Sequence, residues 1–207
     1  YYKHDYSEGV DISRYKNIPV PTSYMAEKSK YDFVGGYDYG KHAGILHVAD
    51  HHVSPGKKQW TWGCGDFGRA WDRNLTDEDG PYVELMTGVY TDNQPDFTWI
   101  MPNETKCFEQ YWYPIREIGC IQNATQDAAL SLEAGTEGVR LGIQATGRFD
   151  GCTLTICKNG VELWRTNADL TPQSPWIQEI TELAGEDETE LSAEVRWNGR
   201  RLVASAP

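Results

Sequence analysis

Hydrophobic and polar residues alternate in short runs along most of the chain. The first half contains AGILHVAD, KKQWTWG, PYVELMTGVY and KCFEQYWYPI, each bounded by Gly, Pro, Asn or Asp. Period-two alternation that ends in turn-forming residues is typical of half-buried β-strands. Good helical periodicity is almost absent. The pattern therefore predicts an all-β protein.

The pattern changes after Gly119. The earlier part is dense in aromatic residues, whereas the later part alternates plainly. Asn159-Gly160 and Asn198-Gly199 lie between alternating runs, which is a strong β-hairpin signal because both residue types tolerate positive φ. We expect residues 127–207 to form a small antiparallel, immunoglobulin-like sandwich of about seven strands. Residues 1–122 would form a separate domain, and IGCIQNATQD, which starts at Ile118, would be the linker.

Charge narrows the range of partners. The chain has 31 acidic and 19 basic residues, a net charge of -12. This balance repels nucleic acid and anionic membranes, so we expect neither as a partner. No apolar run reaches the roughly 18 residues that a membrane-spanning helix needs. The chain starts with Tyr1, and its opening reads as mid-domain sequence, so we expect a fragment of a longer protein.

Cysteine usage indicates a compartment. The five cysteines are irregularly spaced and include no C-x-x-C pair: Cys64, Cys107, Cys120, Cys152 and Cys157. An odd, irregular set favours free and mostly buried thiols in a reducing compartment. We therefore expect a cytoplasmic protein.

The run from Gly56 to Glu84 carries the densest candidate chemistry. Trp60 and Trp62 are two positions apart, so they share one face of a strand. Two indoles on one face either form a stacking platform for sugar rings or belong to the inner face of a sandwich. Both interpretations stay open on the indoles alone.

The glycine-rich, charged segment GCGDFGRAWDR follows these tryptophans, and we expect it to be a long loop between two strands. Long loops in compact domains tend to be functional. Trp71 would then stack on a sugar, while Arg69 and Asp72 would hold its hydroxyl groups.

Glu84 ends this run. It alternates in register with Tyr82 and Met86, and a carboxylate in an aromatic strand is costly unless it is paired or solvated in a pocket. Such a setting suits a general base, and the alternative is an exposed glutamate on an edge strand. The polar segment TDNQPDF follows, where Asp96 would bind hydroxyl groups unless the segment is only a turn anchored by Pro95.

Histidines form another cluster at His47, His51 and His52. A metal site could use His51, His52 and Asp50, but neighbouring residues of a strand point to opposite faces. We therefore favour hydrogen-bonding histidines at a polar site, with His51 binding substrate, and expect no metal. No dinucleotide fingerprint, P-loop, G-x-S-x-G elbow or H-E-x-x-H motif occurs, so we expect no cofactor.

Two long strings in the first half of the chain resemble a known protein family. VGGYDYGKHAGILHVADHHVSPGKKQWTWG and FGRAWDRNLTDEDGPYVELMTGVYTDNQPDFTWIMPNETKCFEQYWYPI resemble a bacterial family of unknown function that is often joined to tetratricopeptide repeats. The resemblance covers roughly residues 7–125, and GKKQWTWG and TDNQPDF are its most specific parts. That family is similar to the galactose-mutarotase superfamily. The resemblance implies that residues 1–122 are the C-terminal part of a β-supersandwich.

The same resemblance implies roles for single residues. Glu84 precedes TDNQPDF and IMPNETK, which places it where mutarotases have their catalytic base. Asp38 in GGYDYG matches a substrate-binding aspartate, although Tyr39 stands where mutarotases often have histidine. KKQWTWG corresponds to a strand that lines the sugar pocket. The catalytic histidines of mutarotases lie in the earlier half of that sandwich, which is expected to precede Tyr1.

We therefore expect a carbohydrate-active protein, a glycoside hydrolase or epimerase when intact, whose fragment is inactive on its own. Its expected partners are a carbohydrate and either the missing half of the domain or tetratricopeptide repeats. The alternatives are a non-catalytic carbohydrate-binding module and a structural β-scaffold. An enzyme would place Glu84 beside a second acid or histidine, a module would expose coplanar indoles, and a scaffold would bury them.

Overall fold

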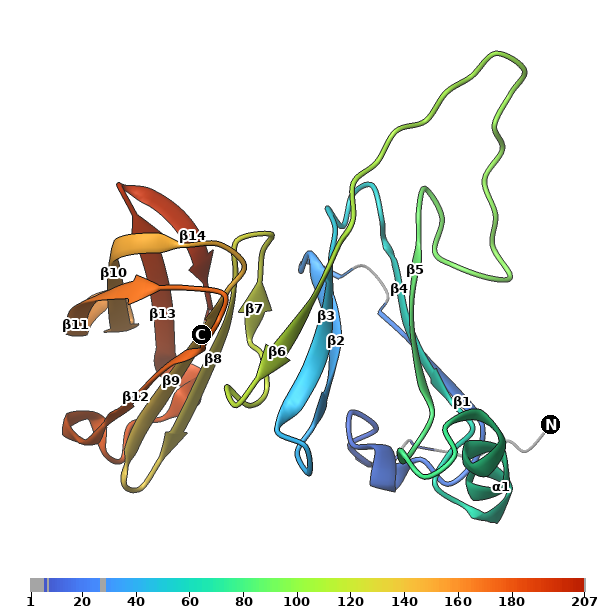
Figure 1. Cartoon of the computed structure of the whole chain (residues 1–207), viewed down its shortest axis with the longest axis horizontal. Helices are drawn as coiled ribbons and strands as arrows, with labels where there is room; N and C mark the ends of the chain where they lie inside the picture. The colour runs from blue at the N-terminus through green and yellow to red at the C-terminus, as the bar shows by residue number, and fades with distance from the viewer. Residues whose placement is uncertain (1–5, 7, 27–28, 207) are drawn as a thin grey trace. The chain divides into compact units, whose positions relative to one another are not determined.

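The computed structural model describes residues 6, 8–26 and 29–206. They form antiparallel sheets, with one α-helix among the described residues, so the predicted all-β class is confirmed. The chain divides into two compact units (Figure 1). The first unit takes in the described residues of Tyr1–Lys30 and Asp50–Phe108, and the second those of Tyr31–Ala49 and Glu109–Pro207. Among the helices of the described residues, none has the length and apolar character needed to cross a membrane.

Two four-stranded sheets form a sandwich in the second unit. Their orders are β12-β9-β8-β7 and β11-β10-β13-β14. The strands are β7 (Asn123–Ala124), β8 (Ala128–Gly135), β9 (Gly138–Ala145), β10 (Phe149–Lys158), β11 (Val161–Leu170), β12 (Trp176–Ile180), β13 (Leu191–Trp197) and β14 (Arg200–Ala204). Two short 3-10 helices, η2 (Thr181–Leu183) and η3 (Glu188–Glu190), lie between β12 and β13. The described residues of 127–206 thus contain seven strands, and their arrangement is sandwich-like, as predicted.

Both predicted hairpin turns occur in this sandwich. Asn159 and Gly160, with φ of 51° and 79°, join β10 to β11. Asn198 and Gly199, with φ of 49° and 79°, join β13 to β14. Two consecutive residues with positive φ match the twist of the flanking strands, and Asn-Gly tolerates this geometry better than other pairs.

A third sheet belongs to the same unit. It has the order β2-β3-β6, formed by Phe33–Asp38, Ala43–Val48 and Tyr111–Arg116. Leu46, Val48 and Ile115 of this sheet share a buried cluster with Ala124 and Ala129 of the neighbouring sheet. The second unit therefore has three sheet layers, with β7, β8, β9 and β12 in the middle one.

The segment expected to be a linker is part of this core. Ile118 is fully buried in the cluster between the outer and middle layers. A Cβ placed on Gly142 of β9 would lie 2.8 Å from the Cβ of Ile118, so the packing there is close. Ile118, the first residue of the expected linker, is thus part of the core of the second unit. The two compact units have other boundaries than the predicted domains, 1–122 and 127–207. The division into these two domains stays a prediction.

The first unit is built on a three-stranded sheet of order β1-β4-β5, formed by Thr22–Met25, Gly56–Thr61 and Val83–Gly88. A 3-10 helix, η1 (Tyr15–Asn17), precedes the sheet. Ile18 is the only large apolar side chain in the buried class among the described residues of this unit. Its stability therefore depends more on hydrogen bonds and close backbone contacts than on a large apolar core.

The segment GCGDFGRAWDR does not form a loop, because most of it lies in helix α1 (Asp66–Leu75). Phe67, Trp71 and Leu75 are four residues apart and lie along one side of that helix. Asp66 in the first turn and Arg73 in the last turn have the charges that the helix dipole favours. The prediction of a loop was wrong because its glycines obscured this short helical repeat.

A long connection follows β5. Residues 89–110 contain neither helix nor strand. The connection carries four strongly exposed apolar side chains, which are Phe97, Trp99, Ile100 and Met101, with exposed fractions of 72%, 71%, 62% and 64%. Such a run of exposed apolar side chains is unusual for a loop surface.

We expect Ile118→Ala to lower the free energy of unfolding by about 2–5 kcal/mol, because it leaves a cavity between two sheet layers. Urea denaturation of the second unit measures this loss. Val161→Ala is the control, since Val161 is 65% exposed and its change should stay within about 0.5 kcal/mol. Equal stability of the two variants would mean that Ile118 belongs to a linker after all.

Candidate functional site

One face of the β1-β4-β5 sheet brings together aromatic and polar groups. The strand register places Trp60 of β4 between Ser23 of β1 and Glu84 of β5. Lys58 pairs with Met86 one step along the same face. A hollow of about 220 Å³ opens here, lined by Ser23, Lys58, Trp60, Glu84, Met86 and Gln94.

The loop after β5 completes this hollow, which we call the Trp60 hollow. Gln94 comes from TDNQPDF, and the amide of its neighbour Asn93 anchors the loop by donating a 3.1 Å hydrogen bond to the carbonyl of Gly56 at the start of β4. Asn93 is buried, with a φ of 88° that asparagine tolerates better than most residues. The polar segment therefore brings Gln94 to the sheet face.

Glu84 has a neighbour that orients it. The Tyr82 hydroxyl donates a hydrogen bond to the Glu84 carboxylate, and this bond, together with burial and the negative charge, raises the pKa of Tyr82. Tyr82 comes directly before β5, two positions ahead of Glu84. Glu84 itself is half-buried.

The three tryptophans of this region form one cluster. The rings of Trp60 and Trp62 meet edge to face, with centroids 4.5 Å apart and planes at 79°. Trp71 of α1 stacks in parallel on Trp62, at 4.5 Å and 8°. Trp60 and Trp62 are half-buried, whereas Trp71 is 37% exposed. Two indoles on one strand face thus do not make a flat platform, because aromatic quadrupoles favour the edge-to-face contact.

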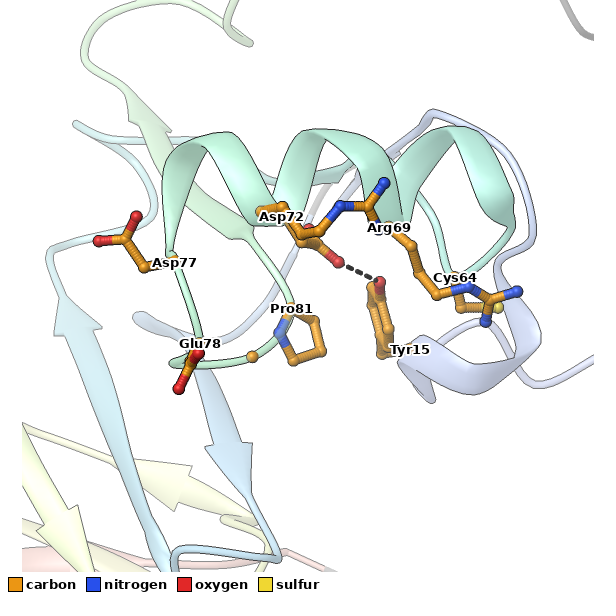
Figure 2. A pocket seen from close by; sticks show the side chains of 9 residues that line it. Tyr15, Cys64, Arg69, Asp72, Asp77, Glu78 and Pro81 are labelled. Atoms are coloured by element: carbon orange, nitrogen blue, oxygen red, sulfur yellow. Dashed lines mark hydrogen bonds between the residues drawn. The ribbon is translucent and has the colours of Figure 1, made fainter.

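A second hollow, of about 370 Å³, lies beside α1 (Figure 2). It is lined by Tyr15, Cys64, Arg69, Asp72, Arg73, Asp77, Glu78, Gly80 and Pro81. Figure 2 shows the Asp72 carboxylate directed at the Tyr15 hydroxyl, 3.2 Å away. Asp72 also accepts a 2.9 Å hydrogen bond from the backbone N–H of Tyr82. This carboxylate therefore braces η1, α1 and the chain entering β5.

The environment of Tyr15 is reflected in its acidity. Its hydroxyl also lies 2.9 Å from the carbonyl oxygen of Gly63. Burial and then the charge of Asp72 raise the pKa of Tyr15 to about 12. Arg69 lines the same hollow but does not join this network through a hydrogen bond to Asp72, and instead pairs with Asp66 at 2.9 Å.

The remaining predicted residues lie elsewhere. Asp38 is in the second unit, where its carboxylate accepts hydrogen bonds from the backbone N–H groups of Gly40 (2.7 Å) and Lys41 (3.2 Å) and so closes the β2–β3 turn. Asp96 is exposed on the long connection, and His51 is half-buried in the turn before β4. None of these three lines either hollow. Of the predicted site residues, the structure brings Trp60 and Glu84 into one hollow and Arg69 and Asp72 into the other.

Beside Met86, three polar residues that line the Trp60 hollow were not predicted as site residues from the sequence. Lys58 had a signal, because it alternates in phase with Trp60. Ser23 had none, since its place depends on its pairing across β1 and β4 with Trp60, which lies 37 positions further along the chain. Gln94 lies in a segment that was singled out, but only the fold shows which of its polar residues faces the sheet.

The cysteines are all free, as expected, but the prediction that most are buried is wrong. Only Cys152 is buried, and this burial raises its pKa to about 11. Cys107 and Cys120 are exposed, while Cys64 and Cys157 are half-buried.

Comparison with protein families gives two matches. Residues 3–115, more than half of the chain, match a model described as a domain of unknown function, DUF5107. Residues 123–205 match a model described as the second domain of YphG-like protein. A comparison with solved structures found no match.

We expect Asp72→Ala to lower the free energy of unfolding of the first unit by about 1.5–3 kcal/mol, the usual contribution of a hydrogen bond to a charged group. Urea unfolding followed by tryptophan fluorescence measures it. Glu78→Ala is the matched control, because Glu78 lines the same hollow but is exposed. If both variants are equally stable, Asp72 does not stabilise the unit. The prediction that Asp72 binds sugar hydroxyl groups would then be favoured.

The raised pKa of Tyr15 predicts a stability change at high pH. The unfolded state releases this proton near pH 10, whereas the folded state keeps it until about pH 12. The contribution to stability is therefore fully present below about pH 10 and is lost as the pH rises towards 12. Wild-type stability should fall more steeply across this window than that of Tyr15→Phe, measured by urea unfolding at a series of pH values. Parallel curves would contradict the role of Tyr15.

Proposed function

We propose that this chain, which belongs to the DUF5107 family of domains of unknown function, binds a carbohydrate in the Trp60 hollow. The proposal rests on one observation, that an indole, a carboxylate, an ammonium group, an amide and a hydroxyl line the same hollow. Small-molecule sites typically combine apolar surface with a few convergent polar groups.

The polar groups suit a polyhydroxylated ligand in particular. Every sugar hydroxyl both donates and accepts hydrogen bonds. Glu84 accepts, Lys58 donates, and Gln94 and Ser23 do both. Trp60 adds a large apolar surface on which the C–H groups of a sugar ring can pack. A ligand with hydroxyl groups around a partly apolar ring therefore fits this set better than a purely apolar or a purely ionic one.

The similarity to mutarotases extends this proposal. We propose that the β1-β4-β5 sheet is part of a larger galactose-mutarotase-like supersandwich. The scarcity of buried apolar side chains in the first unit supports this, because a sheet normally buries one face against another layer. The further partners that the resemblance implies, the other half of such a sandwich and tetratricopeptide repeats, are proposals of the same kind.

A second candidate function is chemistry at the anomeric carbon, with Glu84 as base or nucleophile. The hydrogen bond from Tyr82, which orients the carboxylate, supports this candidate. Glycosidases generally need a second carboxylate. The described residues that line the Trp60 hollow include no second carboxylate and no imidazole. Binding is therefore the leading proposal.

The test is titration of the protein with a panel of mono- and oligosaccharides, followed by tryptophan fluorescence and calorimetry. We expect at least one sugar to bind. Glu84→Gln should weaken its binding by about 10-fold or more, since loss of a charged hydrogen-bond partner costs about 1.5–3 kcal/mol. Trp60→Ala should weaken it similarly.

Two controls make this test specific. Glu78→Gln removes a carboxylate outside the Trp60 hollow, and Trp99→Ala removes an exposed indole on the long connection. Both should leave sugar affinity unchanged. If no sugar in the panel binds, the carbohydrate proposal fails. If a sugar binds equally well to Glu84→Gln, the ligand class stands and the assigned hollow is wrong.

A further inference from the structure

A tight turn lies between β3 and β4, at residues 51–53. The carbonyl oxygen of Asp50 accepts hydrogen bonds from the N–H groups of Val53 (3.1 Å) and Ser54 (2.7 Å), which reverses the chain. The Asp50 carboxylate accepts a further 2.8 Å hydrogen bond from the N–H of His52. The segment is therefore not a strand, and the alternation of strand side chains does not apply to it.

The turn brings together three metal-binding side chains that a strand would have separated. One ligand atom from each of Asp50, His51 and His52 lies within 4.8 Å of the other two. The imidazole rings of His51 and His52 are 3.9 Å apart, centroid to centroid, with planes at 39°. The expectation of no metal assumed a strand at these residues, and the structure has a turn there.

We propose that Asp50, His51 and His52 form a binding site for a divalent transition-metal ion of the zinc type. Two imidazoles and one carboxylate are a common donor set for Zn²⁺, and they leave a fourth position for water. Mg²⁺ and Ca²⁺ prefer sites made of oxygen ligands, so this set selects against them.

The observed spacing is close to what such an ion needs. Zn–N and Zn–O bonds of about 2.0–2.1 Å place tetrahedral ligands roughly 3.3 Å from one another. The three ligand atoms, within 4.8 Å of one another, need to approach by up to about 1.5 Å. Asp50 and His52 are exposed, so side-chain rotation can supply this movement without shifting the backbone. The net charge of -12 further favours a cation at this surface.

This site is separate from the Trp60 hollow. The turn precedes Gly56, the first residue of β4. Trp60 lies four residues beyond Gly56, which is roughly 13 Å along the strand. Neither Asp50 nor the two histidines line the hollow. The metal proposal therefore does not depend on the carbohydrate proposal, and each can fail without the other.

The test is calorimetric titration of the tag-free chain with Zn²⁺, after alkylation of the exposed thiols so that cysteine does not bind the metal. We expect one Zn²⁺ per chain and no uptake of Mg²⁺. Loss of an outer-sphere partner already costs a metal site about 10–100-fold in affinity, so His51→Ala, His52→Ala and Asp50→Asn should each cost at least about 10-fold. His42→Asn is the matched control, because His42 is an exposed histidine outside the turn and asparagine tolerates its φ of 52°.

A second measurement needs no variant. In the NMR spectrum of the wild-type chain, Zn²⁺ should shift the imidazole signals of His51 and His52 and leave those of His42 in place. The proposal is overturned if no Zn²⁺ binds, if the three variants bind it as tightly as His42→Asn does, or if the shifted signals belong to other histidines.

Discussion

Contact between backbone atoms at glycine is the constraint on which the first unit depends. A Cβ on Gly68 of α1 would lie 1.7 Å from the carbonyl oxygen of Gly63, so no other residue allows the helix to lie this close to the end of β4. Gly63 adopts a φ of 87°, which also favours glycine. This close approach sets the position of α1. Trp71 can then stack on Trp62, and Asp72 can reach both Tyr15 and the chain entering β5.

The two units are therefore stabilised in different ways. The second unit has a continuous apolar core between its sheets, in which residues such as Leu132, Leu141 and Leu154 are almost fully buried. The first unit relies on hydrogen bonds, aromatic contacts and close backbone packing. Apolar cores tolerate many substitutions of similar volume, whereas a backbone contact at glycine tolerates almost none. The residues that matter most for the shape of the first unit are thus among its smallest.

This difference explains how much of the fold could be predicted from sequence. Period-two alternation and Asn-Gly turns are local signals, and they were sufficient for the strands around Asn159 and Asn198. Helix α1 was missed because Gly65 and Gly68 indicate a loop, and an interior glycine disfavours a helix by about 1 kcal/mol. The tertiary contact that makes Gly68 necessary has no local signature. Ile118 was assigned to a linker for a similar reason. The residues of β3 and β6 that bury it are distant in the sequence or have no local signal that points to it.

For the candidate site, too, local signals could be read from the sequence and contacts between distant segments could not. Alternation gave the residues that share a face with Glu84 within its own strand, and only the register of β4 with β5 makes Trp60 and Glu84 direct neighbours. Arg69 and Asp72 were assigned by assuming a loop that surrounds the same ligand. In a helix, residues three positions apart share a side, and here that side faces Tyr15 and not the Trp60 hollow.

The long connection after β5 has a consequence for the behaviour of the chain at different ionic strengths. Contact between copies of the chain through its four most exposed apolar side chains would be favourable, while the charge of -12 on every copy repels the other copies. Added salt shortens the range of the repulsion to about 8 Å at physiological ionic strength and leaves the apolar attraction intact. We therefore expect any self-association through Phe97, Trp99, Ile100 and Met101 to increase with salt, opposite to the behaviour of a complex held by complementary charges.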